Sequence, residues 1–210
     1  LASTVVGWRH PDVAEMIAGK ESLDAARDNF GRDLYTEMDS AYAGERSKMA
    51  GFYVKNNVGI AFQAYALGAI VGLGTCFVLL SNGISLGMVT GFILSAGHPT
   101  TENFFSFAIS HGAFELTAIV IAGGGGFVLA RGILFPGQRT RMDSLRHHGF
   151  ESLKLALGAG AMLGIAAMLE GYFSPLPIAA NIKYIVGSCL WLLVIAYLSL
   201  AGRGGTTNEG

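Results

Sequence analysis

The chain divides into a polar N-terminal part and a long apolar remainder. Between His10 and Lys55 acidic residues outnumber basic ones, and Val13, Met16 and Ile17 recur at helical spacing. This pattern predicts short amphipathic helices. From Asn56 to Thr101 the sequence then contains no Asp, Glu, Lys or Arg. A charge-free stretch of this length is enough for two bilayer crossings, which no soluble core helix requires.

Five apolar stretches follow one another, and each predicts a membrane-embedded helix: about Asn57–Leu80, Ile84–Ala96, Phe104–Leu134, Phe150–Phe173 and Ile182–Ala201. The second stretch would cover only about 21 Å at 1.5 Å per residue, so we expect it to be tilted, extended or re-entrant. The predicted fold class is all-α: a polytopic transmembrane helix bundle with about five membrane segments and an N-terminal amphipathic helical extracytoplasmic segment.

Arginines in the loop Phe135–Gly149 predict the orientation. Arg139, Arg141 and Arg146 stand there with one acid, Asp143, and short basic loops stay in the cytoplasm. Alternation then puts Ser81–Gly83 and the C-terminal tail inside, with His10–Lys55, Pro99–Asn103 and Ser174–Asn181 outside.

The same reasoning divides the chain into three parts. The apolar stub Leu1–Trp8 is interpreted as the end of a truncated first span, so residues 1–55 form a polar extracytoplasmic segment after it. Residues 56–202 form the transmembrane domain, and residues 203–210 form a flexible cytoplasmic tail.

Composition agrees with a membrane protein. Hydrophobic residues make up 51% of the chain and charged residues only 14%, well below the fraction typical of soluble domains. The formal net charge of −1 indicates no nucleic-acid partner. Cys76 and Cys189 both lie in apolar runs, where a thiol behaves as a small hydrophobe, so neither a disulfide nor a metal role is assigned.

Glycines recur four residues apart, a spacing that lets helices approach closely in lipid and favours homo-oligomers: Gly68/Gly72, Gly83/Gly87/Gly91 and Gly160/Gly164. The run Gly123–Gly126 is open to three interpretations: a packing face, a kink, or an unwound segment that lines a cavity.

Ionisable residues inside the apolar spans are the main functional candidates, because a charge at mid-bilayer is costly and usually paired or functional. His111 and Glu115 stand four apart and so share one helix face. With Glu170 and Asn57 they form the predicted functional polar network. Asn56, Asn82 and Lys183 are secondary candidates, and Lys183 is expected to snorkel to the interface rather than pair with Glu170.

Three interpretations of His111, Glu115 and Glu170 remain open. The first is a hydrogen-bonded pairing that fixes helix packing. The second is a proton or ion site. The third, with the weakest match, is a metal site that would need additional ligands. The chain lacks a phosphate-binding Gly-Lys-Ser/Thr loop, a nucleophile elbow and a cysteine-rich metal pattern. We therefore predict no catalytic residue, metal or cofactor.

Several segments resemble the stage II sporulation protein M family of bacterial membrane proteins. The most specific is Ser110–Ile119, with its His-Gly-x-x-Glu-Leu core at His111–Leu116; Phe52–Asn57, the glycine-rich span ending in Ser81-Asn82-Gly83, and Leu169–Pro175 occur in the family's order. The resemblance covers roughly Phe52–Trp191.

This resemblance implies a multi-pass protein of the bacterial cytoplasmic (inner) membrane that organises a cell-envelope complex. Its expected partners are membrane lipids, envelope or peptidoglycan-remodelling proteins and an AAA+ ATPase-associated system. The leading hypothesis is thus a non-catalytic membrane component. The alternatives are a transporter or channel that uses the intramembrane His and Glu residues, and an intramembrane metalloenzyme.

Overall fold

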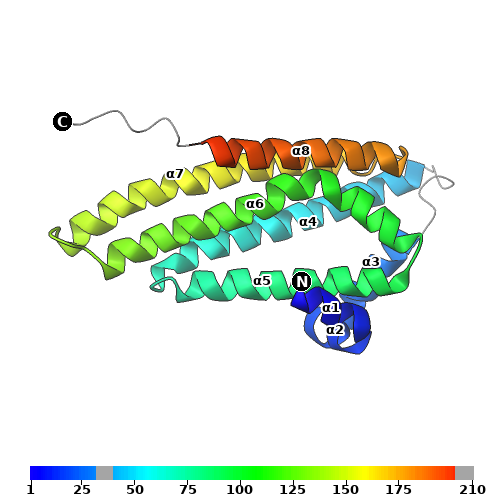
Figure 1. The fold of residues 1–210 in the computed structure, drawn as a ribbon, viewed down its shortest axis with the longest axis horizontal. Helices are drawn as coiled ribbons and strands as arrows, with labels where there is room; N and C mark the ends of the chain where they lie inside the picture. Colours follow the sequence, from blue (N-terminus) through cyan, green and yellow to red (C-terminus); the bar gives the residue numbers. More distant parts are fainter. Residues whose placement is uncertain (32–39, 202–210) are drawn as a thin grey trace.

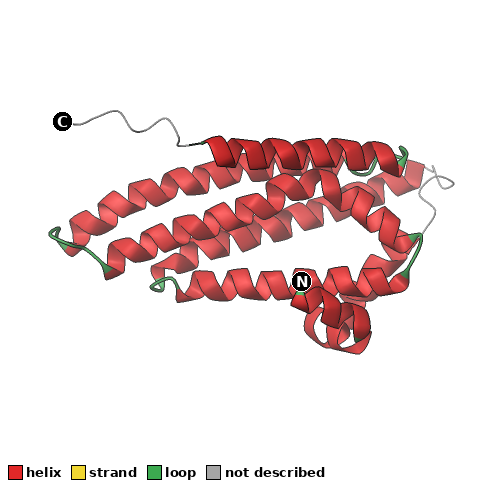
Figure 2. Ribbon diagram, in the orientation of Figure 1, coloured by secondary structure: helices red, strands yellow, loops and turns green. Residues whose placement is uncertain are grey.

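The computed structural model describes residues 1–31 and 40–201, and for residues 40–50, 52 and 53 it describes the backbone alone. The described elements are helices joined by short loops (Figure 2). The predicted tail, residues 203–210, lies outside the described residues.

Five long helices run side by side and alternate in direction (Figure 1): α4 (Ser40–Ala66), α5 (Leu73–Ala96), α6 (Thr100–Leu134), α7 (Arg141–Met168) and α8 (Ala180–Leu200). Helix α6 packs against the other four. Three short helices, α1 (Ala2–Arg9), α2 (Pro11–Ala18) and α3 (Lys20–Gly31), precede them and pack on α5 and α6. The spanning segments are helices, which satisfy most of their backbone hydrogen bonds internally, as a bilayer requires.

Four of the described helical segments are long and apolar enough to cross a membrane: Leu73–Ala96, Thr100–Leu134, Arg141–Phe173 and Ala180–Leu200. Their outer faces carry exposed large apolar side chains, among them Phe77 at 72%, Leu157 at 66% and Leu192 at 67% exposure. Soluble monomers rarely expose so much continuous apolar surface, so lipid is the natural environment of these faces. The predicted multi-pass helical membrane bundle is confirmed.

The predicted break at Ser81–Gly83 is wrong. Helix α5 runs through these residues without interruption, and the Ser81 hydroxyl donates to the Val78 carbonyl within the same helix (3.1 Å). A serine that back-bonds in this way satisfies its polar group without ending the helix. The short second span and the inside loop at this position therefore do not exist.

The chain turns earlier, inside the apolar segment Leu67–Gly72. The 3-10 turn η1 (Leu67–Ala69) leads to Gly72, whose φ of 82° is in the left-handed region that glycine adopts most easily. The buried Thr75 hydroxyl donates to the Ala64 carbonyl (2.7 Å), which ties α5 to the end of α4. The turn carries no charged residue, and hydropathy alone therefore did not reveal it.

Helix α4 is the fifth long helix of the bundle, although it is not among the four segments that are long and apolar enough to cross a membrane. Its first half carries charged residues such as Lys48 and Lys55, while the half after Asn56 is apolar. Its apolar half packs through Ala61 against Ala118 and Ala122 of α6. The bundle thus contains five long helices, and the first two, α4 and α5, have different boundaries from the first two predicted stretches.

Glycines of α6 form a packing face, which decides between the three interpretations of Gly123–Gly126. The helix is continuous there. A Cβ added at Gly126 would lie 2.6 Å from the Ala64 carbonyl oxygen, and one at Gly123 would lie 2.7 Å from the Leu79 side chain. Gly124 faces open space. Gly68 packs directly on Gly126, so two backbones meet where no side chain intervenes.

Helix α1 contains the residues of the predicted stub and packs closely on α5. Gly7 faces the Met88 backbone, and a Cβ added there would lie 2.6 Å from its carbonyl oxygen. Gly91 of α5 faces the α1 backbone in return. Below α1, Ala14 and Leu23 of α2 and α3 are buried with Met88 in one cluster. The predicted short amphipathic helices therefore dock on the bundle.

Candidate functional site

His111 lies in the interior of the bundle, in the first half of α6. Its residue is 7% exposed, and its Nδ1 lies 3.0 Å from the Ser174 hydroxyl. The ring also hydrogen-bonds the Phe107 backbone one turn earlier and contacts the Phe107 ring edge-to-face. These contacts fix the imidazole between α6 and the segment that follows α7.

Glu115 lies one turn further along α6 and faces α4. Its side chain is half-buried and hydrogen-bonds the side chain of Asn57. Asn57 is the first amide of the apolar half of α4 that reaches another helix. An amide in such surroundings requires a polar partner, and the carboxyl group of Glu115 supplies it.

Glu170 lies in a π-helical turn, η2 (Leu169–Phe173), at the end of α7. The Ser174 N–H donates to the Leu169 carbonyl (2.8 Å), five residues back, which is the bond that defines such a turn. Glu170 is 1% exposed, and its Oε2 has no hydrogen-bond partner among the described residues. The turn η2 packs on α6, and the contact between His111 and Ser174 places Glu170 at the level of Glu115 in the antiparallel helices. Single π turns within α-helices occur frequently at functional sites.

Lys183 does not snorkel to the interface, and that expectation is wrong. The residue is 3% exposed, and its Nζ donates to the Ser174 carbonyl (2.8 Å). This carbonyl follows the C-terminal end of η2, where the helix dipole is negative and favours a cation. The Lys183 ammonium group therefore binds the Ser174 carbonyl inside the protein and does not extend to water.

The four residues of the predicted network lie at the level where η2 packs on α4 and α6. They form two adjoining parts. Asn57, Glu115 and Glu170 make up the carboxyl pair with its amide. His111 bonds instead to Ser174, which also accepts from Lys183. The shared helix face of His111 and Glu115 is therefore as expected from their spacing, but each side chain has its own partner.

Of the secondary candidates on α4 and α5, Asn56 contacts this network only through Asn57, and Asn82 lies apart from it. Asn56 is exposed, and its amide donates to the Asn57 side chain at 3.5 Å. Asn82 is half-buried within α5, and no contact among the described residues joins it to the other candidates. Asn82 lies in the middle of α5 and not in a turn.

Two polar residues of the interior were not singled out from the sequence. Ser174 connects His111 with Lys183, and the sequence pointed to its position only through the quoted segment Leu169–Pro175. Ser110 is fully buried, and its hydroxyl has no hydrogen-bond partner among the described residues. Serine is common in membrane helices, so neither residue carries a signal of its own in the sequence.

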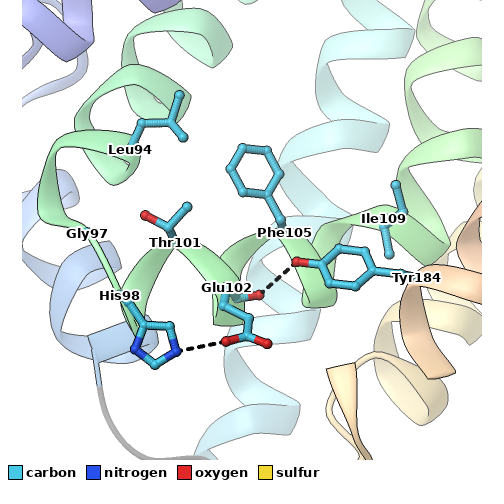
Figure 3. Close-up of a pocket in the computed structure, with 8 residues that line it drawn as sticks. All are labelled: Leu94, Gly97, His98, Thr101, Glu102, Phe105, Ile109 and Tyr184. Atoms are coloured by element: carbon cyan, nitrogen blue, oxygen red, sulfur yellow. Dashed lines mark hydrogen bonds and ion pairs between the residues drawn. The ribbon is translucent and has the colours of Figure 1, made fainter. Parts of the chain in front are cut away.

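An open cavity of about 590 Å³ lies apart from this network, between the end of α5 and the beginnings of α6 and α8 (Figure 3). His98 Nε2 lies 2.8 Å from Glu102 Oε2 at its rim, and the Tyr184 hydroxyl donates to the Glu102 carbonyl (3.4 Å). The other lining residues are Leu94, Gly97, Thr101, Phe105 and Ile109. None of the predicted site residues lines it.

No group of three or more His, Cys, Asp or Glu side chains that could hold a metal ion occurs among the residues that the structure describes. The two acids and the imidazole instead have separate hydrogen-bonding surroundings, as described above.

Comparison with known proteins covers most of the chain. The sequence model of the family described as Stage II sporulation protein M matches residues 1–175. This match includes α1–α3, which the resemblance seen in the sequence did not, and ends before α8. An uncharacterized protein of Methanocaldococcus jannaschii, MJ0793, is 27% identical over 121 residues, which is 57% of this chain and 67% of that protein. No solved structure matches the chain.

Proposed function

The chain belongs to the Stage II sporulation protein M family, and on that premise we propose that it is a non-catalytic component of the cytoplasmic membrane that organises a cell-envelope complex. In this role the bundle anchors the assembly, and the docked helices α1–α3 present a fixed surface to the partners. The proposed partners are envelope or peptidoglycan-remodelling proteins and an AAA+ ATPase-associated system.

The observation that carries this proposal is the fixed attachment of α2 and α3 to the bundle. Asn103 of α6 donates through its amide to the Phe30 carbonyl (2.8 Å), and the Phe30 ring contacts those of Phe104 and Phe107. On the outer face of α2, Met16 is 85% exposed. A fixed helix that presents an exposed apolar side chain is suited to bind a protein partner.

Photo-crosslinking in the native host tests this proposal. A photoreactive amino acid at Met16 is expected to give defined protein adducts, because the α2 surface faces partners. The matched control is Leu192, which is 67% exposed on α8 and faces lipid. It should give lipid adducts only. A deletion strain of the same host provides a second measurement. Loss of the gene should alter the muropeptide profile, and expression of the intact chain should restore it. Protein adducts absent at Met16, together with a normal profile in the deletion strain, would contradict the proposal.

A transporter or channel is the second candidate, and one specific observation favours it. Glu170 and Lys183 are buried at the same end of the bundle, on different helices, and buried ionisable groups mark ion pathways in many membrane proteins. The purified chain in sealed liposomes should then conduct an ion under an imposed gradient. Flux that Glu170→Gln abolishes would favour transport over the organising role.

A further inference from the structure

Two carboxyl groups lie close together inside the bundle, on elements that are far apart in the chain. Glu115 comes from the middle of α6 and Glu170 from the π turn η2, which packs on α6. The contact between His111 and Ser174 fixes the antiparallel register of these elements and places Glu115 and Glu170 at the same level. Among the described residues no ion pair joins either group to a lysine or arginine. We propose that Glu115 and Glu170 form a proton-binding carboxyl pair. This inference is independent of the proposed organising role.

The need for a proton follows from the surroundings of the pair. Two ionised carboxylates would place two negative charges close together where water does not reach Glu170. Both the loss of hydration and the mutual repulsion oppose this state. One proton removes a charge and the repulsion together, as in other pairs of adjacent carboxyl groups in proteins.

The contacts of each residue assign the proton to Glu170. The Asn57 amide hydrogen-bonds Glu115 and compensates a charge there. Oε2 of Glu170 has no donor within reach among the described residues and is completely buried. Glu170 also lies in the last turn before Phe173, where the negative end of the helix dipole disfavours an anion. A neutral carboxylic acid at Glu170 is the form that these surroundings tolerate.

Other ionisable groups on the elements around the pair have different contacts. His111 of α6 bonds to the Ser174 hydroxyl, and Lys183 of α8 donates to the Ser174 carbonyl. On α4, Lys55 is exposed.

Infrared spectroscopy of the intact chain in nanodiscs tests the proposal, with the spectrum in H₂O compared with the spectrum in D₂O. At neutral pH the spectrum should contain the C=O stretching band of a protonated carboxyl group, which shifts in D₂O. Glu170→Gln should remove this band, because the neutral amide replaces the protonated acid with little change in shape. The matched control is Glu102→Gln, which alters an exposed carboxyl group of the same helix as Glu115 and should leave the band intact.

Three outcomes would overturn the proposal. One is a parent spectrum without the band at neutral pH, a result that requires no variant to fold. Another is a band that persists in both Glu170→Gln and Glu115→Gln. The third is a sodium ion in place of the proton: sodium would then raise the melting temperature relative to choline at equal ionic strength, and Glu170→Gln would abolish that rise. A melting temperature that is the same in both salts, together with the loss of the band, supports the proton.

Discussion

The imidazole of His111 and the hydroxyl of Ser174 lie 3.0 Å apart and join the first half of α6 to the residue that follows η2. The carbonyl group of the same serine accepts a hydrogen bond from Lys183 at the start of α8. One small residue thus connects three helices through two polar contacts. Because each contact is buried, its loss leaves a polar group without a partner in a place where water does not replace it.

Replacement of Ser174 by alanine should therefore destabilise the bundle. The Lys183 contact is to the backbone and persists, whereas the His111 ring loses its hydroxyl partner. The expected cost is about 1 to 3 kcal/mol in the free energy of unfolding. Thermal or SDS-induced unfolding followed by circular dichroism measures it. The control is Ser81→Ala, whose hydroxyl bonds only within its own helix. Equal stability of both variants would show that the Ser174 hydroxyl is dispensable.

Alanine at Gly126 and at Gly124 should have opposite effects, although the two positions are almost adjacent. At Gly126 the added methyl group meets the Ala64 carbonyl oxygen and the Thr75 hydroxyl, each at 2.6 Å. The backbones must separate, at a cost of about 1 to 3 kcal/mol. At Gly124 nothing lies within 4 Å, so the higher helix propensity of alanine should leave stability unchanged or slightly increased. The same unfolding assay compares them, and a Gly126→Ala variant as stable as Gly124→Ala would contradict the close packing.

The proposed orientation places the α6–α7 loop in the cytoplasm. Arg141→Cys, in a chain whose exposed Cys76 and Cys189 have been replaced by alanine, should resist an impermeant thiol reagent in intact cells and react after lysis. His98→Cys, in the loop at the opposite end of the bundle (Figure 1), should react in intact cells. The reverse pattern would invert the orientation derived from the arginines.

We propose that the chain forms homo-oligomers and that copies contact one another through the outer face of α7. Gly160 and Gly164 have no neighbour within 4 Å, and their spacing puts both on one flank of the helix. Gly160→Leu should shift the mass of the chain in nanodiscs toward the monomer, because the larger side chain prevents close approach. Gly158→Leu changes an equally open glycine on the opposite flank and serves as the control. A parent chain that is strictly monomeric would rule out this interface.

The sequence by itself determined the class of the protein and most of its helices. The charge-free run from Asn56 to Thr101 and the apolar stretches after Phe104 required membrane helices, since no other element satisfies its backbone in lipid. The four-residue spacing of His111 and Glu115 likewise required a shared face. Both conclusions depend only on local periodicity and on the cost of burying polar groups.

Tertiary structure alone decided where the first apolar region turns and which side chains pair. The chain turns at Leu67–Gly72 and not at Asn82, because the contact between Thr75 and Ala64 stabilises a turn that hydropathy does not distinguish from a helix. Glu170 lies at the level of Glu115, and Ser174 contacts His111, only because α7 folds back antiparallel to α6 and ends in a π turn. Contacts between residues distant in the chain depend on the packing of whole helices, and a local pattern of hydrophobic and polar positions does not contain that information.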